Sequence, residues 1–277
     1  MQERLDGKLA SLKIKEDLKE NFKQLNRKAN LTIIHYSDPA SESYLKGRLK
    51  IADELNVEVN VINVDDNMTT DSLISIIKEL NENKNVDGIM VDRPLPKQFN
   101  EFKVLSSICA EKDVDGYTPM NLGNLVSNKD CNISCTPGAA MRLLEFYNID
   151  LQGKDVLVIG RSVNVGKPLS LLLLNKNATV TIAHSKTVNL KEKCKKADII
   201  FLALGRANFL TKDDVTENTI IVDIGINYDE NGKLCGDASR ECYDVVKAYT
   251  PVPGGVGVMT NIVLMENLLK AAKWNIK

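Results

Sequence analysis

Hydrophobic residues in the first half of the chain alternate between helical spacing and short apolar runs. Leu9, Leu12, Ile14, Leu18 and Phe22 recur at two- to four-residue intervals, and lysines lie between them, which predicts an amphipathic helix. Residues 31–36 form a short run rich in β-forming side chains, which is typical of a buried strand. By the same criteria we predict helices over 8–28, 41–55 and 70–81, and strands over 31–36, 57–64 and 88–91.

The second half repeats the alternation of strand and helix more regularly. We predict strands over 155–159, 179–183, 199–202 and 220–224, and helices over 137–148, 166–175 and 261–273. Alternating strands and helices predict parallel sheets covered on both faces. A chain of 277 residues exceeds the size at which one core usually keeps growing. We therefore expect an α/β protein of two domains, with a ligand-binding cleft between them.

Composition excludes several classes of protein. Lys and Arg total 36 against 37 for Asp and Glu, so no strong field favours nucleic acid or an anionic membrane. No apolar run reaches the roughly 20 residues that span a bilayer, and no secretory segment opens the chain. Six cysteines without a CxxC pair indicate reduced thiols and a cytoplasmic protein, and only two histidines argue against a metal site.

The segment from Val156 to Pro168 has the pattern of a dinucleotide-binding turn. Gly160 follows an apolar strand and Gly166 begins a helix, so the chain turns sharply and presents a helix N-terminus suited to a pyrophosphate. The spacing is G-x5-G, without the middle glycine of the usual GxGxxG pattern. A tight β–α turn that binds nothing is the alternative interpretation.

Residues near this turn favour NADP over NAD. The next strand is followed by His184-Ser185-Lys186-Thr187, where an NAD-binding protein carries an acidic residue for the ribose. A hydroxyl, a lysine and the nearby Arg161 instead suit a 2′-phosphate. The alternative is that Arg161 and Lys186 are solvated surface charges.

Motifs through nearly the whole chain resemble one family, the methylenetetrahydrofolate dehydrogenase/cyclohydrolases. They occur in the family's order and spacing: Asp38-Pro39-Ala40-Ser41 with Tyr44, Asp87-Gly88-Ile89, Pro94-Leu95-Pro96, Lys112 to Gly116, Cys135-Thr136-Pro137, Gly160-Arg161-Ser162, His184 to Thr187, Asp223 to Asn227, and Thr250 to Thr260. The resemblance implies oxidation of 5,10-methylenetetrahydrofolate, with hydrolysis of the methenyl product to 10-formyltetrahydrofolate in many members.

The resemblance also implies roles for individual residues. Tyr44 stacks on the folate ring, and Asp115 accepts hydrogen bonds from the pterin. Pro253, Gly254 and Gly257 form a turn against the folate. The cofactor contacts implied are Thr136, Gly160, Arg161, Ser162, Ser185, Ile226 and Thr260.

The resemblance further implies a domain division and an assembly. The folate-binding catalytic domain comprises 1–137 and 257–277, and a Rossmann-type NADP-binding domain comprises 138–256. A homodimer is expected, with the apolar stretch 180–183 as a candidate interface.

Two departures from the family pattern fall among the expected catalytic residues, Tyr44, Arg48, Asp92 and Asp115. Arg48 stands where bifunctional members carry lysine, and Asp92 stands where they carry glutamine, followed by Arg93 in place of leucine. An arginine stays protonated at any accessible pH and cannot act as a general base, but Asp92 can pair with it. Because hydride transfer needs alignment more than proton chemistry, we expect the dehydrogenase activity to persist. Hydrolysis is expected to be weakened, absent or carried by another group such as Asp92.

Two other functions are consistent with these motifs. One is an NAD(P) dehydrogenase of another small substrate on a similar frame. The other is a folate- or nucleotide-binding protein that has lost catalysis through Arg48 and Asp92. A binding measurement beside a turnover assay distinguishes the second from an enzyme.

Overall fold

The computed structural model describes residues 2–275, and the chain divides into two compact units. Unit 1 comprises the first segment as far as Lys13 together with Thr136–Val263, and unit 2 comprises Ile14–Cys135 and the last segment from Leu264. These boundaries differ from the functional division expected at residues 137 and 257, because the first 13 residues belong to unit 1. No helix among the described residues is both long and apolar enough to cross a membrane.

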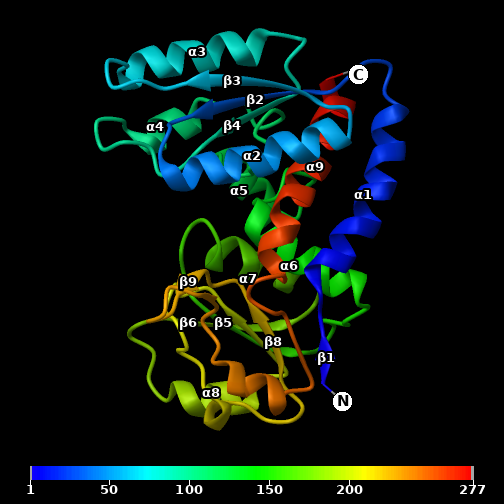
Figure 1. Ribbon diagram of the computed structural model, residues 1–277, viewed down its shortest axis with the longest axis vertical. Coiled ribbons are helices and arrows are strands. Elements are labelled where there is room, and N and C mark those ends of the chain that lie inside the picture. The colour runs from blue at the N-terminus through cyan, green and yellow to red at the C-terminus, as the bar shows by residue number, and fades with distance from the viewer. Residues whose placement is uncertain (1, 276–277) are drawn as a thin grey trace. The chain divides into compact units, whose positions relative to one another are not determined.

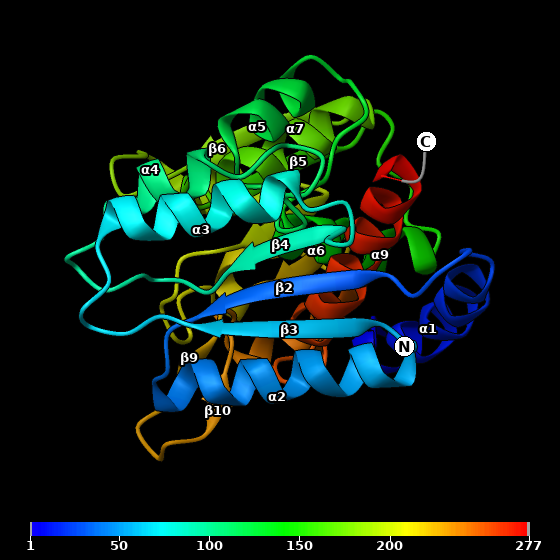
Figure 2. The same ribbon diagram turned by 90° about the horizontal axis from the view of Figure 1, so that it is seen from above.

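Unit 2 contains a three-stranded parallel sheet, ordered β3-β2-β4. The central strand β2 (Asn30–His35) and the strand β4 (Gly88–Val91) are buried along their whole length, whereas the edge strand β3 (Glu58–Asn63) is mostly exposed. The helices α2 (Pro39–Glu54) and α3 (Thr70–Glu82) lie on opposite faces of this sheet (Figures 1 and 2). Right-handed crossovers require this arrangement, because the chain adds β3 on one side of β2 and then β4 on the other side.

Shorter helices complete unit 2. They are α4 (Glu101–Ser106), α5 (Pro119–Val126), and the parts within unit 2 of α1 (Gly7–Lys23) and α9 (Val256–Asn275). One core cluster includes fully buried side chains from β2, α3 and β4: Ile34, Leu73, Ile77 and Ile89. The end of β2 is therefore fixed by packing on both faces of the sheet.

Unit 1 contains a six-stranded parallel sheet, ordered β1-β11-β8-β7-β5-β6. Its strands are β1 (Glu3–Arg4), β11 (Ala248–Tyr249), β8 (Ile220–Asp223), β7 (Ile199–Leu202), β5 (Asp155–Ile159) and β6 (Thr179–Ala183). From β5 the chain first adds β6 on one side and then returns to add β7 on the other. This is the switch point at which parallel α/β sheets bind ligands, at the carboxyl ends of the strands.

The remaining elements of unit 1 flank this sheet. The helix α7 (Gly166–Asn175) packs on β5 and β6, α8 (Leu190–Lys196) packs on β5, and α6 (Cys135–Phe146) enters from the boundary with unit 2. A hairpin of β9 (Asn227–Tyr228) and β10 (Leu234–Cys235) follows β8. Single turns of 3-10 helix span Lys212–Asp214 and Arg240–Asp244.

The predicted α/β class with a Rossmann-type sheet is confirmed, and several helix ends need correction. The first helix ends at Lys23 instead of residue 28, because the amides of Gln24 and Leu25 bond to carbonyls three residues back and close the last turn. The helix predicted over 137–148 begins at Cys135 and ends at Phe146, and the last helix begins at Val256.

Candidate functional site

A buried carboxylate joins two basic side chains at the carboxyl end of the unit 2 sheet. Asp92 follows β4, and its Oδ1 accepts a hydrogen bond from Arg48 of α2. Its Oδ2 lies 2.6 Å from Nδ1 of His35, the last residue of β2. Asp92 is 5% exposed and its backbone amide donates to the carbonyl of Ile34. Both carboxylate oxygens are therefore engaged by basic side chains.

His35 is a member of this cluster that the sequence did not indicate. Its Nε2 lies 3.3 Å from Oε1 of Glu42, which also accepts a hydrogen bond from Ser37. Burial alone would lower the pKa of His35, but the hydrogen bonds to Asp92 and Glu42 outweigh it and the pKa is raised above its usual value. The Ser37 and His35 hydrogen bonds lower the pKa of Glu42. A lone histidine in an apolar run carries no signal of partners that lie elsewhere in the chain.

Asp115 has a strongly perturbed carboxyl group in the same unit. Burial raises its pKa to about 7, against the opposing charge of Arg93 and a hydrogen bond with Cys135. Arg48 lies near enough to lower the pKa of Asp115 further by its charge. The expected catalytic residues Arg48, Asp92 and Asp115 thus belong to one electrostatic neighbourhood. A carboxyl group that is part ionised near neutral pH can accept or donate a hydrogen bond.

Arg93 is the second cation of this neighbourhood. Its guanidinium carbon lies 3.7 Å from the centre of the Tyr117 ring, and its side chain is 15% exposed. Burial raises the pKa of Tyr117, and so does the nearby Asp115. Stacking on the ring holds the Arg93 charge close to Asp115, an arrangement that a leucine at this position cannot provide.

Tyr44 lies on α2 one helical turn before Arg48, so both side chains share a face of that helix. Tyr44 is 54% exposed, which is unusual for a large aromatic side chain without a partner. An exposed ring beside a charged cluster has a free face on which a planar ligand can stack.

The glycine turn of unit 1 is as tight as the sequence predicts. Gly160 has a φ of +140°, and a side chain on Gly166 would place its Cβ 2.2 Å from the carbonyl oxygen of Gly160. The hydroxyl of Ser162 accepts hydrogen bonds from the amides of Val165 and Gly166 and so orders the start of α7. The turn therefore presents exposed Arg161 and Ser162 at the switch point of the sheet.

The turn after β6 lies next to this glycine turn, since Ile159 of β5 pairs with Ala183 of β6. The amide of His184 donates to the Thr187 hydroxyl and the amide of Lys186 donates to Nδ1 of His184, which leaves Ser185 and Lys186 exposed at the tip. A hydroxyl and two cations thus lie at adjacent strand ends, and these groups suit a phosphate.

Asp237 is a second buried polar residue of the candidate site that the sequence did not indicate. This fully buried carboxylate accepts hydrogen bonds from the amides of Leu204, Gly205 and Arg206, after β7, and from the side-chain amide of Asn227, after β8. It ties together two loops at the carboxyl edge of the sheet. Ile226, an expected cofactor contact, lies between Gly225 and Asn227 and is 51% exposed.

The remaining expected contacts also lie in unit 1. They are Thr136 at the start of α6, and Pro253, Gly254, Gly257 and Thr260 at and before the start of α9. Gly254 has a φ of +109°, and its carbonyl accepts a hydrogen bond from the amide of Gly7. A backbone position of this kind favours glycine. The expected folate contacts are thus divided, with Tyr44 and Asp115 in unit 2 and this turn in unit 1.

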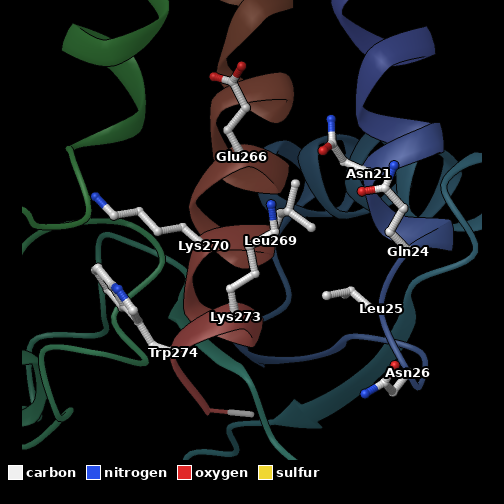
Figure 3. Close-up of a pocket in the computed structure, with 9 residues that line it drawn as sticks. All are labelled: Asn21, Gln24, Leu25, Asn26, Glu266, Leu269, Lys270, Lys273 and Trp274. Atoms are coloured by element: carbon white, nitrogen blue, oxygen red, sulfur yellow. The ribbon is translucent and has the colours of Figure 1, made fainter. Parts of the chain in front are cut away.

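A further pocket in unit 2 contains none of these residues (Figure 3). It is lined by residues after and at the end of α1 and by the last turns of α9: Asn21, Gln24, Leu25, Asn26, Glu266, Leu269, Lys270, Lys273 and Trp274. Lys270 lies over the Trp274 ring at 4.9 Å, donates to the carbonyl of Cys131 and pairs with Asp130, so its charge is already balanced. Among residues 2–275, no group of three or more His, Cys, Asp or Glu side chains is arranged to hold a metal ion.

Fold and site together define a two-unit α/β protein of the dinucleotide-binding class. Comparison with known families is more specific: residues 5–115 match the catalytic domain of tetrahydrofolate dehydrogenase/cyclohydrolase, and residues 134–276 match its NAD(P)-binding domain. The chain belongs to the tetrahydrofolate dehydrogenase/cyclohydrolase family.

Individual relatives align over nearly their whole length. The chain is 46% identical to the bifunctional protein FolD of Thermodesulfovibrio yellowstonii, over 97% of this chain and 96% of the relative. It is 42% identical to the bifunctional protein FolD of Bacillus subtilis, over 97% of each. The crystal structure of the bifunctional FolD dehydrogenase/cyclohydrolase of Campylobacter jejuni superposes with a TM-score of 0.96 at 41% identity, covering 99% of each chain.

Proposed function

We propose that this protein oxidises 5,10-methylenetetrahydrofolate to 5,10-methenyltetrahydrofolate with NADP as the hydride acceptor. The observation that supports this most is the end-to-end alignment with relatives named for the dehydrogenase and cyclohydrolase activities, matched in both halves of the chain. Formation of NADPH from methylenetetrahydrofolate and NADP by the purified protein tests it. A protein that binds both ligands without turnover would instead be a binding protein, and one that oxidises only another substrate would be a different dehydrogenase.

The folate contacts proposed are Tyr44, Asp115, Pro253, Gly254 and Gly257. The exposed ring of Tyr44 stacks on the pterin, and the carboxyl of Asp115 accepts hydrogen bonds from its amino and ring N–H groups. Burial that raises the pKa of Asp115 to about 7 makes these hydrogen bonds depend on pH in the neutral range. The folate-binding part is taken to be residues 1–137 and 257–277, and the cofactor-binding part residues 138–256.

The cofactor contacts proposed are Thr136, Gly160, Arg161, Ser162, Ser185, Ile226 and Thr260. The glycine turn fits a pyrophosphate, because any side chain at Gly160 or Gly166 would meet backbone atoms and the helix start is ordered by Ser162. Arg161 and Ser185 at neighbouring strand ends suit the 2′-phosphate of NADP. The bound dinucleotide supplies the hydride acceptor, and the chain's own residues bind and align the two reactants.

We propose that hydrolysis of the methenyl product is weak in this protein. Arg48 stays protonated at accessible pH and cannot act as a general base, and both oxygens of Asp92 are held by Arg48 and His35. The sequence left open that Asp92 carries the hydrolysis, but a carboxylate engaged on both oxygens is a poor general base. Loss of methenyltetrahydrofolate absorbance at no more than a few times the uncatalysed rate is expected, in a sample that is an active dehydrogenase.

A homodimer and a cytoplasmic location complete the proposal. The strand β6 is an edge of the unit 1 sheet, and its residue Ile182 is 41% exposed. An apolar edge strand is a natural site for pairing with a second copy. All six cysteines are free thiols, the state that a reducing compartment maintains.

A further inference from the structure

The ring of His35 faces a carboxylate at each of its nitrogens. Nδ1 lies 2.6 Å from Asp92 and Nε2 lies 3.3 Å from Glu42, while the residue is 1% exposed. A neutral imidazole has only one N–H, so it would point a lone pair at one of these two negative oxygens. The geometry therefore favours the imidazolium form, which donates to both carboxylates.

The protonation state of His35 decides whether Asp92 is shared by two cations or is paired with Arg48 alone. With His35 protonated, the buried carboxylate is shared by two cations, and the group of His35, Asp92 and Arg48 carries a net charge of +1 by formal count. With His35 neutral, Asp92 is paired with Arg48 alone and the net charge falls to zero. Glu42 lies at the exposed side of the cluster, where water and the nearby Lys46 screen it.

We propose that His35 is a positioning residue that sets the charge presented by the Arg48–Asp92 pair, and thereby the rate of hydride removal from the folate. This inference rests on the proposed dehydrogenase function. The residue acts through Asp92 without touching the substrate.

The chemistry of the oxidation gives the direction of the effect. Removal of hydride from the neutral methylene carbon breaks a C–H bond, sends both electrons to the nicotinamide and leaves a methenyl cation. A net positive charge nearby raises the energy of the transition state, in which this cation is forming. Loss of the His35 proton removes that charge, so the rate should rise with pH. The charged groups that face His35 are Asp92 after β4 and Glu42 on α2, and Arg48 reaches it through Asp92.

The carboxylates on both sides raise the pKa of His35 above its usual value of 6.5, which brings the step toward neutral pH. One unit charge acting over roughly 10 Å in a partly solvated site changes a rate by about tenfold. Asp115 also titrates near pH 7, so the two ionisations must be separated by experiment.

The test compares the pH dependence of kcat/KM for methylenetetrahydrofolate, with saturating NADP, in three proteins. His35→Asn keeps a donor toward Asp92 but cannot titrate, and Asp53→Asn is the control because it removes an exposed titratable group of α2 that lies outside the cluster. The pKa of His35 is measured independently by NMR of its ring signals in the unmodified protein, and the signals that His35→Asn lacks supply the assignment.

We expect kcat/KM of the unmodified protein and of Asp53→Asn to rise about tenfold across the pKa measured for His35. His35→Asn should lack that rise and keep only the step of Asp115. Retention of the full rise in kcat/KM by His35→Asn would overturn the inference. A kinetic step in the unmodified protein that does not coincide with the measured pKa of His35 would also overturn it, and that comparison needs no variant. An unmodified protein without NADPH formation at any pH would refute the proposed function itself.

Discussion

The guanidinium carbon of Arg93 lies 3.7 Å from the centre of the Tyr117 ring, so a cation is held over an aromatic face within the field of Asp115. Desolvation raises the pKa of Asp115, and the charge of Arg93 opposes that rise. Part of the Asp115 carboxyl population is therefore ionised at neutral pH. Arg93 therefore acts on the carboxylate proposed to bind the pterin, without being a proposed folate contact itself.

Replacement of Arg93 by leucine should raise the pKa of Asp115 above about 7, because the charge that lowers it is removed. Fewer Asp115 side chains are then ionised at pH 7, and KM for methylenetetrahydrofolate should rise several-fold. The difference in KM between the variant and the unmodified protein should shrink by pH 9, where Asp115 is ionised in both proteins. Lys97→Met, which removes an exposed cation from the same segment, serves as the control. An equal increase in KM at both pH values would contradict this explanation.

The double variant Arg48→Lys with Asp92→Gln restores the lysine–glutamine pair of the bifunctional family pattern. A lysine without a carboxylate partner can exchange its proton in a desolvated site, so methenyl hydrolysis should increase at least tenfold. Arg48→Lys alone should gain much less, because Asp92 would hold the new ammonium group as an ion pair. The rate is followed by loss of methenyl absorbance, with dehydrogenase activity measured in parallel. Equal gains in the single and double variants would show that Asp92 does not restrain the cation.

Arg161→Ala should raise KM for NADP about tenfold and leave KM for NAD nearly unchanged, since only NADP carries the 2′-phosphate. Lys176→Ala removes an equal charge from the opposite end of α7 and should affect neither cofactor. Initial rates with each nucleotide give the comparison. A parallel loss for both nucleotides would assign Arg161 to the pyrophosphate or to the fold.

Gly166→Ala should lower the free energy of unfolding by about 3 kcal/mol, because its Cβ would lie 2.2 Å from a backbone oxygen that cannot move independently. Gly123→Ala is the matched control. No atom lies within 4 Å of a Cβ placed there, and the position is inside α5, so this change should be neutral or stabilise by about 0.5 kcal/mol. Urea unfolding of the three proteins measures both values. A Gly166→Ala protein of unchanged stability would mean that the turn relaxes.

Ile182→Lys should convert the proposed dimer to a monomer, since it places a charge in the exposed edge strand β6. Val61→Lys changes a comparably exposed residue on β3, the edge strand of the unit 2 sheet, and should leave the assembly intact. Sedimentation velocity distinguishes the species. A monomeric unmodified protein would remove the dimer from the proposal.

The sequence predicted the fold where the signal is local. The strand over 155–159 and the helix over 166–175 were predicted with the bounds that the structure has, because an apolar run followed by Gly160 and Gly166 needs no distant information. The pairing of β1 with β11 was not predicted, since two residues show no periodicity and their partner is more than 240 positions away. The short helices α4 and α5 were missed for a similar reason, because they have only 6 and 8 residues.

The candidate site shows the same limit. Arg48 and Asp92 were expected to pair, because both departed from one family pattern, and the structure brings them into contact. His35 lies 57 residues before Asp92, and Asp237 lies 33 residues after Leu204. A buried polar residue within an apolar segment indicates that a partner exists, but the tertiary fold decides which residue that partner is. The roles of the individual site residues remain predictions.

Asp237 constrains how this protein can change its cofactor preference. Its two oxygens accept hydrogen bonds from backbone amides of the loop after β7 and from a side chain of the loop after β8. An insertion or deletion in either loop would leave a buried negative charge short of donors and would disturb the other loop as well. The two loops are therefore expected to vary together among descendants of this chain. Grafts intended to redesign this edge of the sheet should transplant both loops together with the aspartate.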